Sequence, residues 1–279
     1  MEKRNIQFNK KRELPEIITD SFAFLKQEIG PISRLIVVYV LPFIVLYAAA
    51  QIYFQRNILS EFNFGDPEKM ASNISPIYRH AFLFLLFGIF IQSLLAGTYY
   101  TYLEAYFRKG RGNIDISEIS PYFFTHSLFA LVTGLVFAAL SFLGAMFFII
   151  PGIYLANTLS LAVFISILEK NGLNFALAKS WKLVHTNWWN TLVINVIGLL
   201  IIFGVKLVLS IPVMSLDVSQ GLASETLNTS ANYPQWYWIL TGATSVISSI
   251  ALIVPYTFLA FQYFNLEERI NPELPTNNQ

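Results

Sequence analysis

One ionisable residue lies inside an apolar stretch of the chain, and it is the first candidate for a functional residue. Lys206 belongs to the stretch 191–214, which otherwise carries no charge. Ionisable side chains inside a membrane usually mark substrate or ion pathways. A lysine stem can also carry its charge toward the interface, and Asn157 or Gln92 are candidate hydrogen-bond partners. Both roles stay open at this point: a substrate contact near Lys206, or a charge satisfied structurally.

Three glutamates share one repeated position in the sequence. Glu104, Glu169 and Glu267 each follow a leucine at the end of an apolar stretch, and the chain holds no other Leu-Glu pair. Negative charge is disfavoured at a helix C-terminus, so basic neighbours are expected to compensate it. We expect interfacial ion pairs, among them Glu104 with Arg108 at helical spacing and Glu169 with Lys179. A functional acidic site is the alternative, if the repeats bring the three carboxylates together.

Patterns typical of catalysis or metal binding are missing from the sequence. The chain has no Cys, and its 3 His lie in separate connections without paired spacing, which argues against a metal site. No GxSxG, P-loop or GxGxxG motif occurs. The serines at 245, 248 and 249 have no base nearby and suit helix packing. We therefore predict no catalytic residue, no metal and no cofactor, and expect a non-enzymatic protein.

The elements that must position these residues are membrane-spanning helices. The chain is 55% hydrophobic and 13% charged, whereas about a quarter of the residues in soluble domains are charged. Pro151-Gly152 is expected to form the tight turn between the third and fourth apolar stretches. The stretches long enough to cross a bilayer as helices are residues 35–54, 81–102, 128–150, 152–168, 191–214 and 236–264.

The distribution of Lys and Arg orients these spans. Of the 18 Lys and Arg, fourteen lie in connections on one side and only three on the other. Positive residues stay in the cytoplasm, so both termini, with the polar tails 1–13 and 271–279, are predicted there. The compact loops indicate a bacterial cytoplasmic (inner) membrane. A net charge of +1 gives no basic face for nucleic acid. The expected partners are membrane lipids and another membrane protein or a second copy of the chain.

An internal repeat organises the predicted helices within a single transmembrane domain. Residues 14–30 and 172–189 carry one apolar stripe with identical spacing, and Ser21-Phe22 aligns with Ser180-Trp181. Such stripes predict amphipathic helices that lie in the cytoplasmic interface. A weaker copy at residues 114–124 is interrupted by Pro121. The predicted fold class is an all-α integral membrane protein: six transmembrane helices as three hairpins, each preceded by a cytoplasmic interfacial segment.

Residues 151–189 carry a family resemblance. The pattern begins with a Pro-Gly pair and a helix that is predicted to cross back to the cytoplasm and to end in an acidic residue. A glycine, an AL-x-x-S segment, an aromatic residue and a final tryptophan follow. These positions are Pro151, Gly152, Glu169, Gly172, Ala176, Leu177, Ser180, Trp181, Asn187 and Trp188. The pattern resembles that of YciC-like bacterial membrane proteins and of the membrane domain attached to some glycerophosphodiester phosphodiesterases. The resemblance implies a six-helix bacterial membrane domain without an agreed activity. No counterpart of the phosphodiesterase catalytic domain is expected in this chain, so no catalytic residue carries over.

Two functions of different classes fit these observations. A scaffold or accessory subunit for membrane partners fits an interior with few polar groups and the small-residue spacing of Gly134, Ala138 and Ser141. A transporter or lipid-handling protein with a cavity near Lys206 is the alternative. Pro255 could interrupt the last helix, and transporters often bind substrate where helices are discontinuous. We expect the scaffold role, because only Lys206 supplies charge within the spans.

Overall fold

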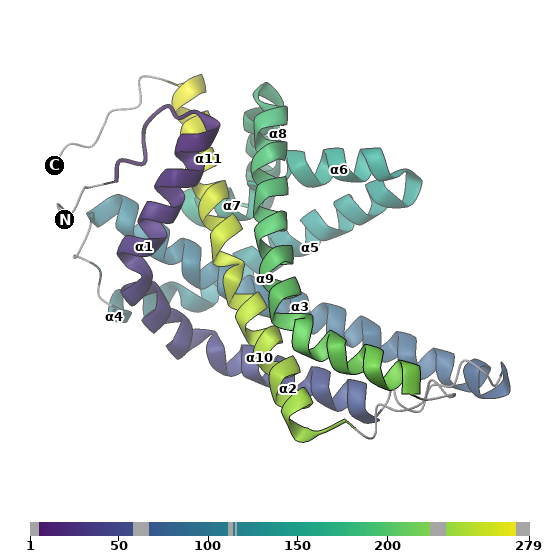
Figure 1. Ribbon diagram of the computed structural model, residues 1–279. Coiled ribbons are helices and arrows are strands. Elements are labelled where there is room, and N and C mark those ends of the chain that lie inside the picture. Colours follow the sequence, from purple (N-terminus) through teal and green to yellow (C-terminus); the bar gives the residue numbers. More distant parts are fainter. Residues whose placement is uncertain (1–5, 58–66, 111–113, 115, 224–232, 272–279) are drawn as a thin grey trace. The chain divides into compact units, whose positions relative to one another are not determined.

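The computed structural model describes residues 6–57, 67–110, 114, 116–223 and 233–271, and every regular element in these ranges is a helix (Figure 1). The prediction of an all-helical chain is confirmed. The elements are α1 (Leu14–Tyr39), α2 (Leu41–Asn57), α3 (Pro67–Lys109), α4 (Ile116–Ile119), the 3-10 helix η2 (Ser120–Tyr122), α5 (Phe123–Phe147), α6 (Ile149–Thr158), α7 (Ala162–Glu169), α8 (Leu173–Thr186), α9 (Trp188–Ala223), α10 (Gln235–Ala251) and α11 (Ile253–Ile270).

Five helical segments are long and apolar enough to cross a membrane, and the pair α1 and α2, bent by 59°, would make a sixth. The predicted stretch 35–54 falls on that bend. The most apolar stretches are poorly covered by other helices. In the most apolar 18 residues of the α9 segment only 11% are buried, and in those of the α5 segment only 17%. Helices this apolar and this exposed are typical of contact with lipid. The five segments are Ile77–Lys109, Ser120–Phe147, Ile149–Glu169, Trp188–Leu216 and Gln235–Ile270.

Three breaks in the apolar helices lie just before a proline, whereas Pro31 and Pro212 lie within the continuous helices α1 and α9. Pro42, Pro151 and Pro255 each occupy the second or third position of a helix, in α2, α6 and α11. The missing N–H of proline costs nothing there, whereas its ring would clash with a carbonyl in a continuing helix. The chain therefore leaves the helical conformation a few residues before each proline. The breaks lie at Val40, Phe148 and Leu252.

The turn between α5 and α6 differs from the predicted Pro151-Gly152 turn. The helices separate at Phe148, which is extended at φ −159° and ψ 148°, and Pro151 and Gly152 belong to the first turn of α6. Gly152 instead serves close packing: a Cβ at this position would lie 2.6 Å from the Cβ of Ala145 on α5. Glycine is thus needed here for the approach of two helices, not for an unusual backbone angle.

Gly152→Ala is expected to lower the free energy of unfolding by about 1–3 kcal/mol, because the added methyl group overpacks the α5–α6 contact. Thermal unfolding in a mild detergent measures this loss. Gly134→Ala is the matched control, since its Cβ would meet only Ser93 Oγ at 3.9 Å. We expect the control to be neutral or stabilising, as alanine favours a helix more than glycine does. Equal stabilities of the two variants would contradict this account of Gly152.

The helices form two compact units, which are described separately. The first comprises Met1–Tyr39, Ser93–Leu200 and Leu252–Gln279, and the second Val40–Gln92 and Ile201–Ala251. An aromatic core holds the first unit together. Phe8, which precedes α1, contacts four other buried rings at centroid distances of 5.0 to 5.7 Å. These rings belong to Phe24 on α1, Tyr106 on α3, and Phe261 and Phe264 on α11.

The second unit is built around α2. Helix α10 packs on it so closely that a Cβ at Gly242 would lie 3.1 Å from Ile52. The Ser245 hydroxyl of α10 also donates to the side-chain oxygen of Gln51. On α2, the ring of Tyr47 contacts Phe87 of α3 at 5.4 Å between centroids. Apolar packing with few polar contacts between the described residues is typical of helices that associate within lipid.

Helices α1 and α8 bury equivalent positions of the internal repeat. When Ser21 is aligned with Ser180, the buried residues coincide, and the aromatic residue that follows each serine is 43% exposed in Phe22 and 42% in Trp181. Helix α1 packs on α11, and α8 packs on α7. The predicted apolar stripe is therefore not the buried face, because the packing face begins one residue earlier. The coincident residues are Ile17, Ser21, Phe24 and Leu25 in α1, and Ala176, Ser180, Leu183 and Val184 in α8.

Candidate functional site at the helix ends

Two of the three repeated glutamates meet at one lysine. Lys179 of α8 places its Nζ 2.5 Å from Glu169 Oε1 and 3.1 Å from Glu267 Oε1. Tyr263 of α11 completes the group, donating from its hydroxyl to Glu169 Oε1 at 2.5 Å and accepting from Lys179 Nζ at 3.3 Å. The Glu169–Lys179 ion pair expected from the sequence is formed. We call these four residues the Lys179 cluster.

The Lys179 cluster is largely shielded from solvent. The side chains of its lysine and two glutamates are only 14 to 20% exposed. Charges in such a setting interact more strongly than at an open surface, and hydrogen bonds to ionised groups are the strong ones. Because Glu169 ends α7, Lys179 lies on α8 and Glu267 lies near the end of α11, the cluster joins three helices. Two carboxylates also face one ammonium, so the lysine separates like charges.

Glu104 is neutralised by a different set of residues. Its Oε1 lies 3.0 Å from Arg108 Nη2, the pair predicted at helical spacing, and 3.0 Å from Lys170 Nζ. Its Oε2 is 3.9 Å from His126 Nδ1, which also forms a 2.7 Å hydrogen bond with Thr101 Oγ1. The three glutamates therefore do not converge on one site. Glu104 binds Lys170 of the α7–α8 turn, whereas the other two share Lys179.

The turn between α7 and α8 depends on backbone conformations that few residues adopt. Lys170 caps α7 in the left-handed region at φ 55°, and Gly172 precedes α8 at φ 84°. A Cβ at Gly172 would meet no atom within 4 Å, so the requirement for glycine there is conformational. The family-motif glycine thus sets the direction in which α8 leaves Glu169 and brings Lys179 back to it.

Gly172→Ala is expected to cost about 1–2 kcal/mol of stability, the usual penalty for a residue with a Cβ in the left-handed region. Unfolding of the detergent-solubilised protein measures the change. Gly30→Ala provides the control: a Cβ there also meets nothing within 4 Å, but Gly30 lies in α1 and has no positive φ. If both variants matched the parent protein, the turn would not require glycine at position 172.

Side chains of Ser180, Trp181 and Trp188 hold α6 against α8 and the beginning of α9. Ser180 Oγ donates to the carbonyl of Thr158 at 2.8 Å, and Trp188 Nε1 donates to Thr158 Oγ1 at 3.2 Å. The rings of Trp181 and Trp188 both contact Tyr154, each at 5.7 Å. These residues do packing and hydrogen bonding between helices. Their arrangement supports a structural role for the motif.

Lys206 belongs to none of these charged clusters. It lies exposed on α9 and forms no ion pair with residues that the structure describes. Asn157, one candidate partner, donates to the carbonyl of Trp188 at 3.0 Å and accepts from Asn195 at 2.8 Å. A lone ammonium on an apolar helix reaches for the interface or for a phosphate. Lys206 is therefore not a member of the glutamate network.

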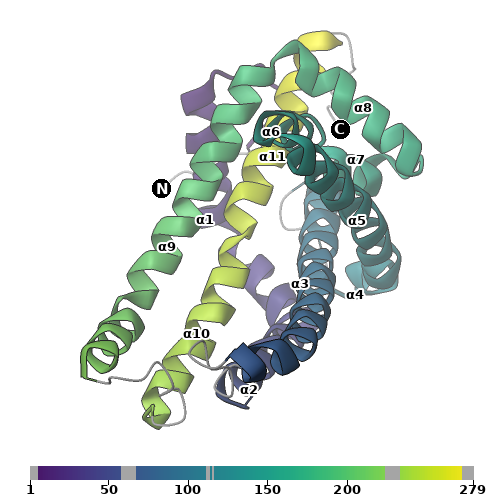
Figure 2. The ribbon, with the colours of Figure 1, turned by 90° about the vertical axis from the view of Figure 1, so that its right-hand side faces the viewer.

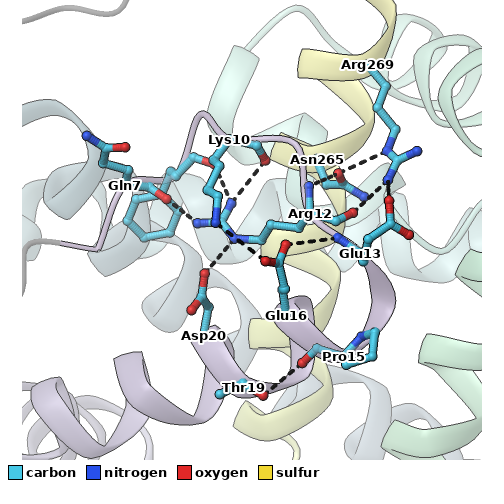
Figure 3. Close-up of polar contacts among 11 residues, drawn as sticks. Gln7, Lys10, Arg12, Glu13, Pro15, Glu16, Thr19, Asp20, Asn265 and Arg269 are labelled. Carbon is cyan, nitrogen blue, oxygen red and sulfur yellow. Dashed lines mark hydrogen bonds and ion pairs between the residues drawn. The ribbon is translucent and has the colours of Figure 1, made fainter.

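Sequence reasoning missed Arg12, which it counted only among the cytoplasmic positive charges. Its side chain is 1% exposed, and its Nε donates to Asp20 Oδ2 at 2.8 Å. The guanidinium also donates to backbone carbonyls of Phe8 at 2.8 Å and Lys10 at 3.3 Å, and to that of Gln7 (Figure 3). It lies 5.0 Å from the centroid of Phe261. Arg12 thereby fixes the segment before α1 in a tight loop.

The end of α11 holds the same segment from the other side. Asn265 Oδ1 accepts the Arg12 backbone N–H at 2.8 Å, and Arg269 donates to the Arg12 carbonyl at 2.7 Å. Arg269 also pairs with Glu13 at 3.1 Å (Figure 3). Because Glu267 lies between Asn265 and Arg269, one helix end joins both the N-terminal segment and the Lys179 cluster. No periodic pattern could have revealed this, since the partners lie at opposite ends of the chain.

The chemistry of these residues is charge neutralisation. In the part of the chain that the structure describes, no group of three His, Asp or Glu is arranged to hold a metal ion. Lys179, Lys170, Arg108 and Arg12 each bind a carboxylate of the same protein. Such pairs stabilise helix ends and orient helices.

No protein-family model matches the chain, and no curated protein or solved structure matches it.

Proposed function

We propose that the protein is an integral protein of the bacterial cytoplasmic membrane that serves as a non-catalytic scaffold or accessory subunit for membrane partners. Both termini and the Lys179 cluster lie in the cytoplasm, as the distribution of Lys and Arg indicates. The first and third pairs of apolar segments cross outward and back, each led by an interfacial helix, α1 or α8. The resemblance to YciC-like proteins supports the same location.

The observation that carries this proposal is the contrast between satisfied charges and an uncovered apolar surface. The repeated glutamates are bound by lysine or arginine within the protein. Helix α9, by contrast, has only 11% of its most apolar 18-residue stretch buried. Helices associate in lipid by packing such surfaces. A protein of this kind offers a partner a rigid apolar face, and offers a substrate few free polar groups.

Photo-crosslinking in the membrane tests the scaffold role. A photoreactive amino acid at Phe203 of α9, which is 63% exposed, is expected to give one discrete protein adduct. The same species should co-purify at a fixed stoichiometry in mild detergent. Thr19, exposed on α1, is the control position and should not give that adduct. Adducts with lipid alone, together with a tightly bound solute, would contradict the scaffold role.

A transport or lipid-handling role is the second candidate, and exposed Lys206 on an apolar helix favours it. Lys206→Met is expected to change the free energy of unfolding by less than about 0.5 kcal/mol, because the side chain is exposed. Thermal unfolding checks this. Under the scaffold role, Lys206→Met should also retain the crosslinked partner. A variant of unchanged stability that lost a bound lipid or solute would favour transport.

A further inference from the structure

The turn between α5 and α6 has an unusual composition for a connection at a membrane surface. Residues 142–153 contain no polar side chain, only Phe, Leu, Gly, Ala, Met, Ile and Pro. The other two connections predicted on the outer side both carry charge, such as Arg56 in one and Glu225 in the other. Membrane–water interfaces favour Trp, Tyr and charged residues. The α5–α6 turn lacks all of them.

The same turn is exposed on every side. Five consecutive residues at the end of α5 and the start of α6 are each 74 to 80% exposed. Consecutive residues of a helical turn point in different directions, so no single docking face accounts for this exposure. A protein partner would cover one side and leave the others in water. Lipid acyl chains would cover them all. The five residues are Met146, Phe147, Phe148, Ile149 and Ile150.

The depth of the turn is limited by where α6 is attached. Tyr154, five residues after the start of α6, stacks on Trp188 at 5.7 Å and approaches His185 Nδ1 at 3.5 Å. His185 belongs to α8, the helix of Lys179, which the proposed function places at the cytoplasmic interface. Five helical residues rise only about 7.5 Å, whereas the hydrocarbon core is about 30 Å thick. The turn cannot reach the far surface from this anchor.

We propose that α5 and α6 form an intramembrane arm whose turn ends within the hydrocarbon and is surrounded by lipid acyl chains. In Figure 1 the pair projects away from α1 and α11 of the same unit, and Figure 2 shows it end-on. Helix α5 has 25 residues, which is about 37 Å of helix. Because its far end must stay at the shallow depth of the turn, α5 lies oblique to the membrane normal. The prediction of six crossings is then replaced by four crossings and one arm.

Two backbone hydrogen bonds close the turn between α5 and α6. The N–H of Phe148 donates to the Gly144 carbonyl at 3.2 Å, and the Phe148 carbonyl accepts from Gly152 at 3.3 Å. Pro151 has no N–H to satisfy. These two bonds and the missing N–H of Pro151 reduce the number of unpaired backbone groups at the two helix ends, which lowers the cost of placing the turn in hydrocarbon.

Spin-label accessibility measures the position of the turn. Because the chain has no Cys, Phe148→Cys gives a single labelling site in the full-length protein reconstituted in phospholipid vesicles. We expect the label to be accessible to molecular oxygen and shielded from the water-soluble Ni(II) chelate NiEDDA. The ratio of the two should place it several ångströms below the headgroups. Ile150→Cys provides a second label at the same turn if Phe148→Cys fails to fold.

Two control sites separate this inference from the proposed membrane location on which it rests. Asn57→Cys, exposed at the end of α2, should be accessible to NiEDDA, and Leu200→Cys, 62% exposed on α9, should not. If Leu200→Cys also reports water, the membrane location itself is wrong. If only the turn reports water, the arm is wrong and the pair crosses fully. Shielding of the turn from both reagents would mean that protein, not lipid, covers it, and would also overturn the proposal.

Discussion

Arg12→Ala is expected to destabilise the protein by about 3 kcal/mol, the loss typical of removing one partner from a buried ion pair. The arginine is 1% exposed, so its removal leaves a cavity in the first unit as well as the Asp20 carboxylate without its cation. Three backbone carbonyls lose their donor at the same time. Each unsatisfied buried acceptor carries its own penalty. The segment before α1 should then be held only by Phe8 and by its backbone hydrogen bonds to α11.

Two comparison variants distinguish these causes. Lys11→Ala removes the neighbouring charge, which is exposed, and should change stability by less than about 0.5 kcal/mol. Arg12→Lys keeps the charge but lacks the planar fork of donors, so it should recover only part of the loss. Thermal unfolding in one detergent compares all three. A full recovery by lysine would show that charge alone holds the segment, and a neutral Arg12→Ala would refute its structural role.

Lys179→Ala is expected to cost about 2–4 kcal/mol, more than either Glu169→Ala or Glu267→Ala alone. The lysine separates two carboxylates at 2.5 and 3.1 Å, so its loss leaves like charges together in a poorly solvated place. Each single glutamate variant leaves one carboxylate still paired with the lysine. Adding Glu267→Ala to Lys179→Ala should therefore restore part of the lost stability. Chemical or thermal unfolding of the detergent-solubilised variants measures these differences.

A double-mutant cycle isolates the Glu169–Lys179 interaction. The double variant should be more stable than the sum of the single losses predicts, by at least about 0.5 kcal/mol, as contacting residues usually are. Lys10 and Glu16 provide a matched pair on the surface, 3.7 Å apart with side chains 45% and 50% exposed. That pair should be additive within about 0.5 kcal/mol. Additivity at Glu169 and Lys179 would remove the argument that the cluster stabilises the helix ends.

The features that the sequence predicted correctly are those set by a pattern along the chain, such as hydrophobicity over a long stretch or helical spacing. Long apolar stretches predicted the helices, and the local spacing of Glu104 and Arg108 predicted their ion pair. The repeated Leu-Glu positions correctly indicated residues that need a cation. Amphipathic spacing found α8, although the face that packs starts one residue before the stripe. In a membrane protein both lipid and protein interior are apolar, so an apolar stripe alone does not say which of them it faces.

The rest depended on contacts between distant parts of the chain. Arg12 looks like any positive residue before a helix, and only the folded chain shows it enclosed between Phe8, Asp20 and Phe261. The α5–α6 turn was misplaced because Pro and Gly are common in turns, whereas here both begin a helix. Proline is also favoured in the first turn of a helix, and glycine is also favoured where two helices approach closely. Sequence alone does not decide between them.

In the proposed topology the Lys179 cluster lies on the cytoplasmic side of a multi-pass membrane protein, and sided labelling of single cysteines measures whether it does. Asn171→Cys lies exposed in the α7–α8 turn beside the cluster, and Asn57→Cys lies exposed at the end of α2. A membrane-impermeant maleimide should modify Asn171→Cys only in inverted vesicles and Asn57→Cys only in intact spheroplasts. Modification of both cysteines from the same side would contradict the account.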